Sequence, residues 1–426
     1  MSTLPRLLTI MGSGETTPTM ARVHRTILDR LGERPVPAVV LDTPYGFQEN
    51  ADDITARALD YFRATVGAPF VAASFRSADA DALTRETALV RIRDARLVFT
   101  GPGSPSYALR QWAGSEIPRL LSDKLAGGGA VTMASAAALT LGRYTIPVYE
   151  IYKVGEPPRW LEGLDLLTPL GLPVAVVPHY DNAEGGNHDT RFCYMGERRL
   201  GMLEAELPAD VFILGVDGHT ALVLDLVAGT GSVFGLGTVT VRKDGRSVVF
   251  PSGSEVSIDG LVAAARAEGV AGVPAAQPAS SRAPAGGSGP GSAPLSEEVA
   301  RLEAVFSASL EECDAQSAVR AILGLEETIQ AWSHDTDQSD ALATARSALR
   351  SAIVCLGEMA EKGSGDPAET VRPFVDALLA ERVRARIARD WAAADAIRDR
   401  LLDAGIELRD SPDGTTWELR AGASVS

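Results

Sequence analysis

Short apolar runs alternate with amphipathic stretches over residues 1–265. The apolar runs predict buried strands at 6–11, 38–43, 70–75, 96–101, 129–134, 174–178 and 211–216. Stretches with apolar residues three or four positions apart predict helices at 21–32, 51–66 and 80–95. Strands that alternate with helices indicate an α/β fold with a doubly wound, mostly parallel sheet. Later apolar segments without intervening helices predict an antiparallel extension at one edge, at 220–226, 232–243 and 247–253.

The pattern changes at residues 266–294, which consist largely of Ala, Pro, Gly and Ser. Such a segment buries too little apolar surface to offset the entropy lost on ordering, so we predict a flexible linker. Helical spacing returns in 295–426, which predicts an α-helical domain that ends in a small β-hairpin around a Pro-Asp-Gly turn. The predicted helices span 295–312, 315–332, 340–360, 367–391 and 392–405, and the hairpin spans 406–419.

Polar and glycine-rich residues follow the carboxyl ends of most of the predicted strands. These ends meet at one edge of an open sheet, where ligands bind, so the loops are expected to form one site. Ser135 directly follows the strand at 129–134, and His179 directly follows the strand at 174–178. A hydrolytic serine needs an exposed hydroxyl, an imidazole base and donors for the oxyanion. The pattern therefore predicts Ser135 as a nucleophile on a strand-to-helix turn and His179 as its base.

The oxyanion donors are expected in the same loops. The backbone amide of Ala136 would lie at a helix N-terminus, where developing negative charge is stabilised. A second donor is expected from Gly101 or Gly103, because glycine lets a backbone amide approach closely. The non-catalytic interpretation is an ordinary serine in an alanine-rich helix beside a buried core histidine.

A carboxylate must orient His179, and Glu150 is the first candidate, with Asp181 and Asp217 as alternatives. His179 and His188 are the only close histidine pair and have carboxylates nearby, which leaves a metal site as a less favoured alternative. No HExxH or CxxC spacing supports such a site. We therefore expect no metal and no other cofactor.

Charge and composition exclude some function classes. The formal net charge is −16, which argues against non-specific binding of nucleic acid through overall charge. The three cysteines, Cys193, Cys313 and Cys355, are far apart, so neither a disulfide framework nor a thiolate metal site is expected. The N-terminus lacks a signal-peptide pattern, and no apolar window is long enough to span a membrane. A cytoplasmic protein with no membrane partner is predicted; its oligomeric state is not indicated.

The motifs GPGSPSYALRQW, TMASAAAL, VVPHYD, HDTRFCYMGERRLG and VDGHTALVL follow one another in this order. In this order they resemble the aspartyl dipeptidase and cyanophycinase serine peptidase family, over about residues 5–255. The resemblance implies a class I glutamine amidotransferase-like fold, with Ser135 as nucleophile, His179 as base and Glu150 as third member. The family elbow reads Gly-x-Ser-Ala-Gly-Ala, whereas Met133 and Ala137 occupy the glycine positions here. Related amidotransferases carry a cysteine at the elbow, and its absence argues against glutamine-derived ammonia chemistry.

A substrate carboxylate is a candidate ligand for arginines after His188. Arg191, Arg198 and Arg199 are expected on one helix, where Arg191 and Arg198 share a face because they are seven residues apart. Guanidinium forks bind carboxylates, but a solvated or salt-bridged helix face explains the same pattern. The residues predicted to bind substrate are Glu15, Tyr45, Ser104, Asp181, His188, Arg191, Arg198 and Asp217.

The segment LLAERVRARIARDWAAADAIRDRLLDAGIELRDSPDGTTW is similar to the C-terminal end of cysteinyl-tRNA synthetases, and the resemblance covers about residues 295–420. In that family this region meets the anticodon stem and loop of tRNA. The resemblance implies tRNA binding, with the cysteine isoacceptor as the expected partner, although a cluster of arginines is also typical of a solvated helix face. No HIGH-type or KMSKS-type motif is present, so the chain is not expected to charge tRNA. The positions implied in tRNA binding are Arg386, Arg389, Asp395, Arg398 and Asp410.

The leading hypothesis is a serine peptidase-like hydrolase fused to a tRNA-binding module. Its expected substrate is a small peptide or an aminoacyl or peptidyl group carried on tRNA. The alternative hypothesis is a catalytically retired hydrolase fold that serves as a tRNA-binding or protein-docking regulatory protein. The departures at Met133 and Ala137 are the observation that keeps this alternative open.

Overall fold

The computed structural model describes residues 4–32, 34–183, 188–266, 293–312, 314–336, 340–363, 367–411 and 414–419. The chain divides into two compact units, one of Met1–Leu302 with Leu323–Ser347, the other of Glu303–Ile322 with Ala348–Ser426. Most of the predicted linker and the Pro-Asp pair of the predicted turn lie outside the described residues. The division into 1–265, 266–294 and 295–426 therefore stays a prediction.

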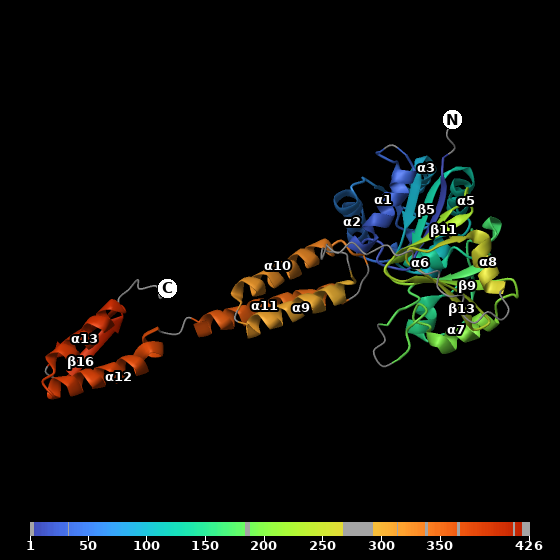
Figure 1. The fold of residues 1–426 in the computed structure, drawn as a ribbon. Coiled ribbons are helices and arrows are strands. Elements are labelled where there is room, and N and C mark those ends of the chain that lie inside the picture. Colours follow the sequence, from blue (N-terminus) through green and yellow to red (C-terminus); the bar gives the residue numbers. More distant parts are fainter. Residues whose placement is uncertain are drawn as a thin grey trace. The chain divides into compact units, whose positions relative to one another are not determined.

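An eight-stranded sheet forms the centre of the first unit (Figure 1). Its strands in spatial order are β14 (Glu255–Ser257), β11 (Thr230–Gly235), β10 (Thr220–Asp225), β1 (Arg6–Met11), β5 (Gly129–Ala134), β4 (Leu97–Thr100), β2 (Ala38–Leu41) and β3 (Val71–Ala73). The five strands from β1 to β3 in this order are parallel, and β10, β11 and β14 pair antiparallel at one edge. The predicted mostly parallel sheet is confirmed.

Helices cover both faces of this sheet, with α1 and α2 on one face and α5 on the other (Figure 1). Side chains alternate along β1, so Leu7 and Met11 join the cluster that contains α1 residues, and Leu8 and Ile10 join the opposite cluster. The sheet is therefore doubly wound. The helices of this part are α1 (Ala21–Arg30), α2 (Ala51–Tyr61), α3 (Ala82–Asp94), α4 (Pro105–Trp112), α5 (Ile117–Gly127) and α6 (Ser135–Leu139).

A second sheet has four strands in the order β13 (Arg246–Pro251), β12 (Thr238–Lys243), β9 (Phe212–Val216) and β8 (Val174–Val177). The expectation that the strands at 174–178 and 211–216 extend the main sheet was wrong. Both edges of β1 are occupied, by β5 and β10, whereas β8 and β9 pair with each other and β9 pairs with β12. The predicted antiparallel extension is likewise divided, because β12 and β13 belong to this second sheet.

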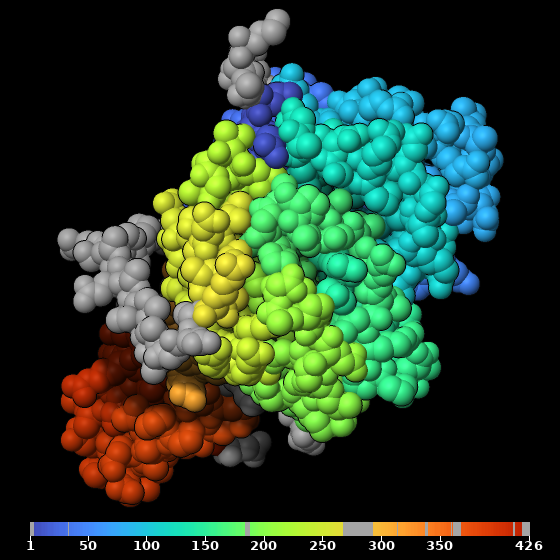
Figure 2. All heavy atoms as spheres, turned by 90° about the vertical axis from the view of Figure 1, so that its right-hand side faces the viewer, coloured from blue at the N-terminus to red at the C-terminus, as the bar shows by residue number. Residues whose placement is uncertain are grey.

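Two more helices, α7 (Gly196–Ala205) and α8 (Ile258–Arg266), lie on the side of the unit seen in Figure 2, where α8 is yellow. The unit also contains short strands and short 3-10 or π helices. The short elements are η1 (Pro18–Met20), η2 (Thr43–Tyr45), η3 (Phe62–Val66), β6 (Tyr144–Thr145), η4 (Glu150–Val154), β7 (Leu161–Glu162) and η5 (Thr168–Leu170).

The C-terminal part is helical and ends in a β-hairpin, as predicted. Its elements are α9 (Leu295–Glu311), α10 (Ala315–Ala331), α11 (Ala341–Gly363), α12 (Pro367–Ile387), α13 (Trp391–Asp403), β15 (Ile406–Ser411) and β16 (Gly414–Leu419). In the second unit, Val375 of α12, Leu401 of α13 and Ile406 of β15 form a buried cluster. Within the described part of the chain, no helix is both long and apolar enough to cross a membrane.

Candidate active site and candidate tRNA interface

Ser135 lies at the junction between strand β5 and helix α6. All six residues of β5 are buried, and Ala134 is still extended, whereas Ser135 has a φ of +48°. A left-handed conformation costs an L-residue about 1–2 kcal/mol, so the surrounding structure must hold the serine there. The side chain of a residue in such a turn projects away from both strand and helix, which is the geometry that a nucleophilic serine requires.

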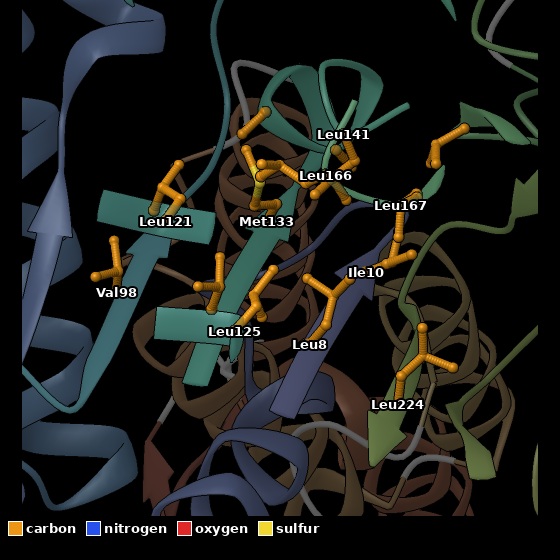
Figure 3. Close-up of a cluster of buried hydrophobic side chains, with 14 of the residues drawn as sticks. Leu8, Ile10, Val98, Leu121, Leu125, Met133, Leu141, Leu166, Leu167 and Leu224 are labelled. Carbon is orange, nitrogen blue, oxygen red and sulfur yellow. The ribbon is translucent and has the colours of Figure 1, made fainter. Parts of the chain in front are cut away.

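Met133 and Ala137 are accommodated in the core. Met133 is fully buried and points among Leu141, Leu166 and other apolar side chains (Figure 3). Ala137 is also fully buried in this cluster, and its amide donates to the carbonyl of Gly101 at 3.2 Å. Side chains at these two positions therefore fill the interior and do not displace Ser135 from its turn.

His179 meets Ser135 directly. The His179 Nε2 atom lies 2.8 Å from the Ser135 Oγ atom, within hydrogen-bond distance. His179 follows β8 and, like Ser135, has a φ of +48°. The carbonyl of His179 accepts a hydrogen bond from the amide of Cys193 at 3.1 Å. Two residues 44 positions apart are thus held in contact by two strained turns, one after each strand.

A buried arginine supports the loop that carries His179. Arg242 of β12 is 5% exposed, and its guanidinium lies 5.6 Å from the ring centre of Phe192. The amide of Phe192 in turn donates to the carbonyl of Tyr180, the residue after His179, at 2.9 Å. Two carboxylates of α7 hold the guanidinium, Glu204 at 3.0 Å and Glu197 at 2.6 Å. Burial raises the pKa of Tyr180 to about 12, so its hydroxyl stays neutral.

Glu150, the predicted third member, stays a prediction. Glu150 begins η4, and its neighbour Ile151 packs in the same buried cluster as Tyr180. One carboxylate oxygen of Glu150 is buried with no hydrogen-bond partner among the described residues. The two alternatives have other partners: Asp217 accepts from the amide and hydroxyl of Thr238 at 2.8 Å, and Asp181 accepts from the amide of Gly218 at 2.7 Å. Burial raises the pKa of the Asp217 carboxyl.

The predicted oxyanion loop lies against the elbow. Gly101 follows β4 and contacts α6 through the amide of Ala137. Gly103 has a φ of +132°, and a Cβ atom there would lie 2.1 Å from the carbonyl oxygen of Pro44, so only glycine fits. The amide of Ala136 belongs to the first turn of α6, whose amides have no acceptor within the helix. These amides remain the predicted donors.

Glu15 lies beside this loop. Its side chain is 2% exposed, and a carboxylate oxygen would be 2.8 Å from a Cβ atom built on Gly101. The backbone carbonyl of Glu15 accepts from His24 Nε2 at 2.7 Å. Burial lowers the pKa of His24 to about 4, so this ring is neutral and structural. Glu15 therefore lies beside Gly101, and its role in substrate binding stays a prediction.

Two other predicted substrate residues have structural partners. The Tyr45 hydroxyl pairs with the Thr55 hydroxyl at 3.1 Å, and burial raises the pKa of Tyr45. Ser104 caps helix α4, since its hydroxyl accepts from the amide of Tyr107 at 3.1 Å. These hydrogen bonds give Tyr45 and Ser104 a structural role, and contact with a substrate is not needed to explain their positions.

The expectation that Arg191 shares a helix with Arg198 and Arg199 was wrong. Helix α7 begins at Gly196, and a run of residues with positive φ, 192–194, separates Arg191 from it. Arg191 instead forms a bidentate pair with Asp189, with both contacts at 2.9 Å, which lowers the pKa of Asp189. Arg198 is on α7 and exposed.

His188 does not join His179 in a cluster of metal ligands. Its ring stacks against Tyr152, with ring centres 6.4 Å apart. Across the described parts of the chain, no group of three or more His, Cys, Asp and Glu side chains is placed to hold a metal ion. His179 is instead engaged with Ser135.

Among the predicted tRNA-binding residues, Asp410 anchors the hairpin to α12. It accepts two hydrogen bonds from Arg382, at 2.8 and 2.7 Å, and Arg386 lies 3.4 Å away. Arg382 is 4% exposed, so this pair is part of the fold of the second unit. Asp395 and Arg398 are exposed on α13. Arg389 has a φ of +60° where α12 ends.

Trp391 is a candidate residue that the sequence analysis missed. It begins α13 and is 59% exposed, although tryptophan is usually buried. It follows Arg389 closely in the chain, and exposed aromatic rings beside arginines are typical of surfaces that stack nucleic-acid bases. The Asp-Trp pair after an arginine-rich helix was the signal available in the sequence.

The left-handed turn at Ser135 gives a stability prediction. Replacing Ser135 with glycine should give a protein about 1 kcal/mol more stable than replacing it with alanine, because alanine is strained at positive φ and glycine is not. At an ordinary helical position, alanine is more stable than glycine. Ala138→Gly in α6 is therefore the matched control and should be destabilising. Urea unfolding of the three variants measures the difference. A more stable alanine variant at position 135 would contradict the strained turn.

The Arg382–Asp410 pair gives a pH prediction. Hydrogen bonds from Arg382 hold the pKa of Asp410 below its ordinary value of about 3.9. The pair therefore stabilises the second unit above about pH 4, and this contribution is lost as pH falls. Hydrogen exchange of β15 and β16, corrected for intrinsic rates, should show Asp410→Asn less protected at pH 7 and less sensitive to acid than wild type. The same substitution at exposed Asp376 should leave the wild-type pH dependence unchanged.

Comparison with known proteins confirms the resemblance of the C-terminal region. Residues 371–417 match the family model of the cysteinyl-tRNA ligase anticodon binding domain. The cysteine–tRNA ligase of Shewanella baltica (strain OS223) is 38% identical over 135 residues, which cover 30% of this chain and 28% of that protein. The cysteine–tRNA ligase of Arthrobacter sp. (strain FB24) is 35% identical over 123 residues, 28% of this chain and 25% of that protein. The chain thus spans less than a third of the length of these curated relatives.

A solved structure also resembles the chain. The crystal structure of a peptidase from an acI-B1 Actinobacterium covers 60% of this chain and 97% of its own, with 20% sequence identity and a TM-score of 0.48.

Proposed function

We propose that the first unit is a serine hydrolase and that the C-terminal region binds tRNA. The observation that carries the first part is the 2.8 Å contact between Ser135 Oγ and His179 Nε2, with both residues at positive φ directly after a strand. Backbone strain of this kind persists where the surrounding structure holds it and is concentrated at active sites.

In the proposed first step, the Ser135 Oγ atom attacks an acyl carbon and its proton passes to His179 Nε2. The carbonyl π electrons move onto oxygen, and the resulting oxyanion accepts from the amide of Ala136 and from an amide of the 101–103 loop. When the carbon–oxygen double bond forms again, the leaving group departs with the proton from His179. An acyl group is then joined to Ser135.

In the second step, water attacks the acyl carbon and gives a proton to His179. Collapse of the second oxyanion expels Ser135 Oγ, which recovers the proton, and the acid product leaves. Glu150 is assigned to orient the imidazolium that forms in each step, as the resemblance to the serine peptidase family implies.

The proposed substrate is a small peptide or an acyl group carried on tRNA. The second is supported by the fusion alone, since both halves of the chain would then act on one molecule. A tRNA partner also agrees with the predicted cytoplasmic location.

Turnover of p-nitrophenyl acetate tests the hydrolase proposal. The full-length chain should release p-nitrophenolate in a burst followed by a slower steady rate, because this activated ester acylates Ser135 faster than the acyl group is hydrolysed. Ser135→Ala should lose both phases. Ser247→Ala is the matched control and should retain both phases, because Ser247 is an exposed serine of β13 that is not among the candidate site residues. Equal turnover by wild type and Ser135→Ala would overturn the proposal and favour a retired hydrolase fold.

Binding of tRNA is tested with the full-length chain in gel shifts at stated salt concentrations. Arg398→Ala should weaken binding and, if Arg398 contacts a phosphate, lower the slope of log affinity against log salt by about 1. Arg350→Ala, an exposed arginine of α11 in the same unit, should bind like wild type. Sequencing of the retained tRNA identifies the isoacceptor. Equal weakening by both variants would show that binding follows overall charge and does not depend on α13.

A further inference from the structure

A short segment after α10, residues 332–336, is packed against the loops of the candidate site. This segment belongs to the first unit, although the helix before it and the helix after it extend into the second. Trp332 and Thr336 are each 3% exposed, a degree of burial that is unusual for a connection between two helices. Burial at both ends of the segment indicates that it has a docking role.

The first anchor of this segment is the loop at 12–17. The amide of Thr336 donates to the hydroxyl of Thr16 at 2.9 Å, and the two threonine hydroxyls also lie 2.9 Å apart. Thr16 is fully buried. Because both groups are removed from water, loss of either hydroxyl would leave a buried polar group without its partner, which is costly.

Helix α2 is the second anchor. His334 Nε2 donates to a carboxylate oxygen of Asp60 at 2.8 Å, and Arg57 donates to the carbonyl of Asp335 at 3.4 Å. A third anchor is the loop at 216–220, where the Trp332 ring packs edge-on against His219 with ring centres 5.4 Å apart. The segment thus ties together three parts of the first unit.

The first anchor, Thr16, leads toward the proposed oxyanion loop. Thr16 is the neighbour of Glu15, whose buried carboxylate lies against Gly101. The carbonyl of Gly101 accepts from the amide of Ala137, two residues after Ser135. A displacement of the loop at 12–17 would therefore be transmitted through Glu15 to the proposed oxyanion loop.

We propose that residues 332–336 are a positioning clamp that fixes Glu15 and the 101–103 loop, so that the reactivity of Ser135 depends on a segment continuous with the helical region. This inference rests on the proposed hydrolase function. The clamp acts through the loop and touches no reacting atom. Its effect is on the placement of oxyanion donors, where a displacement of about 1 Å can cost about 100-fold in rate.

Saturation kinetics with a fluorophosphonate probe test the clamp, because they separate probe affinity from the maximal rate of labelling of Ser135. Thr16→Val, which removes the acceptor for Thr336, should lower the maximal rate about tenfold or more with little change in affinity. Thr16→Ser retains the hydroxyl and should restore the wild-type rate. Thr9→Val is the matched control, because Thr9 is buried in β1 with no hydroxyl partner among the described residues, and it should label like wild type.

Two further measurements keep the test decisive. Thr336→Val loses only the hydroxyl contact and should slow labelling in the same direction if Thr16→Val does not fold. Hydrogen exchange of residues 12–17 should accelerate in both variants, whether or not the serine reacts. Wild-type rates of Ser135 labelling in both variants would overturn the clamp alone. A wild-type chain that is not labelled would overturn the proposed hydrolase and, with it, the link of the clamp to Ser135.

Discussion

Replacing His179 with glycine is expected to slow fluorophosphonate labelling of Ser135 by about 10²–10⁴-fold, because the serine loses its general base. Glycine is chosen because it accepts the φ of +48° at this position without strain and leaves space where the ring was. Labelling is followed by the mass of the intact protein over time.

Added imidazole provides the control for this result. Free imidazole should enter the vacated space and recover part of the labelling rate of His179→Gly, while Ser135→Ala stays unlabelled under the same conditions. An unchanged rate in His179→Gly without imidazole would contradict the assignment of His179 as the base. A melting temperature close to that of wild type separates loss of the base from loss of the fold.

Replacing Arg242 with methionine is expected to reduce the free energy of unfolding by about 3–5 kcal/mol, since it leaves Glu204 buried without its cation. The side chains of Arg242 and Glu204 are only 6% and 9% exposed. A double replacement, Arg242→Met with Glu204→Met, should recover much of the loss, because replacing a whole buried ion pair by apolar side chains is often close to neutral. Denaturant unfolding measures each variant.

An exposed ion pair provides the comparison. Arg119 pairs with Glu116 and Asp123 on α5, but its side chain is 61% exposed. Arg119→Met should therefore change stability by about 1 kcal/mol or less. If Arg242→Met is equally mild, Arg242 does not support the loop that carries His179.

The strands and helices were predictable because burial imposes a period on the sequence. Most predicted elements lie within a few residues of those observed, and the junction of β5 with α6 at Ser135 was found in this way. Strand partners are not encoded in the same local pattern. The pairing of β8 with β9 and β12 depends on which edges are already filled, so the second sheet was missed.

Contacts between residues that are distant in the sequence limited how much of the candidate site could be predicted. Ser135 and His179 were paired because each follows a strand that was expected in one sheet. Their strands, β5 and β8, belong to different sheets, although the two side chains lie 2.8 Å apart. Their catalytic roles stay predictions. Arg191 was misplaced because a run of positive φ has no periodic signal in the sequence. The contact between Thr16 and Thr336 joins residues 320 positions apart, and nothing in either local sequence indicates it.

The proposed functions of the two parts of the chain rest on different kinds of evidence. The resemblance of the C-terminal region to cysteinyl-tRNA synthetases is confirmed over residues 371–417. The hydrolase rests on the geometry of Ser135 and His179, and its third member, Glu150, is still a prediction. A direct test of the serine therefore has the greatest weight.

Labelling of the folded, full-length chain with a fluorophosphonate, followed by peptide mass spectrometry, tests the central claim most directly. Our account predicts one phosphonyl adduct, on Ser135, which forms in the native chain and is absent after denaturation or in Ser135→Ala. No adduct on Ser135 in the native chain, with a control serine hydrolase labelled in the same mixture, would contradict it.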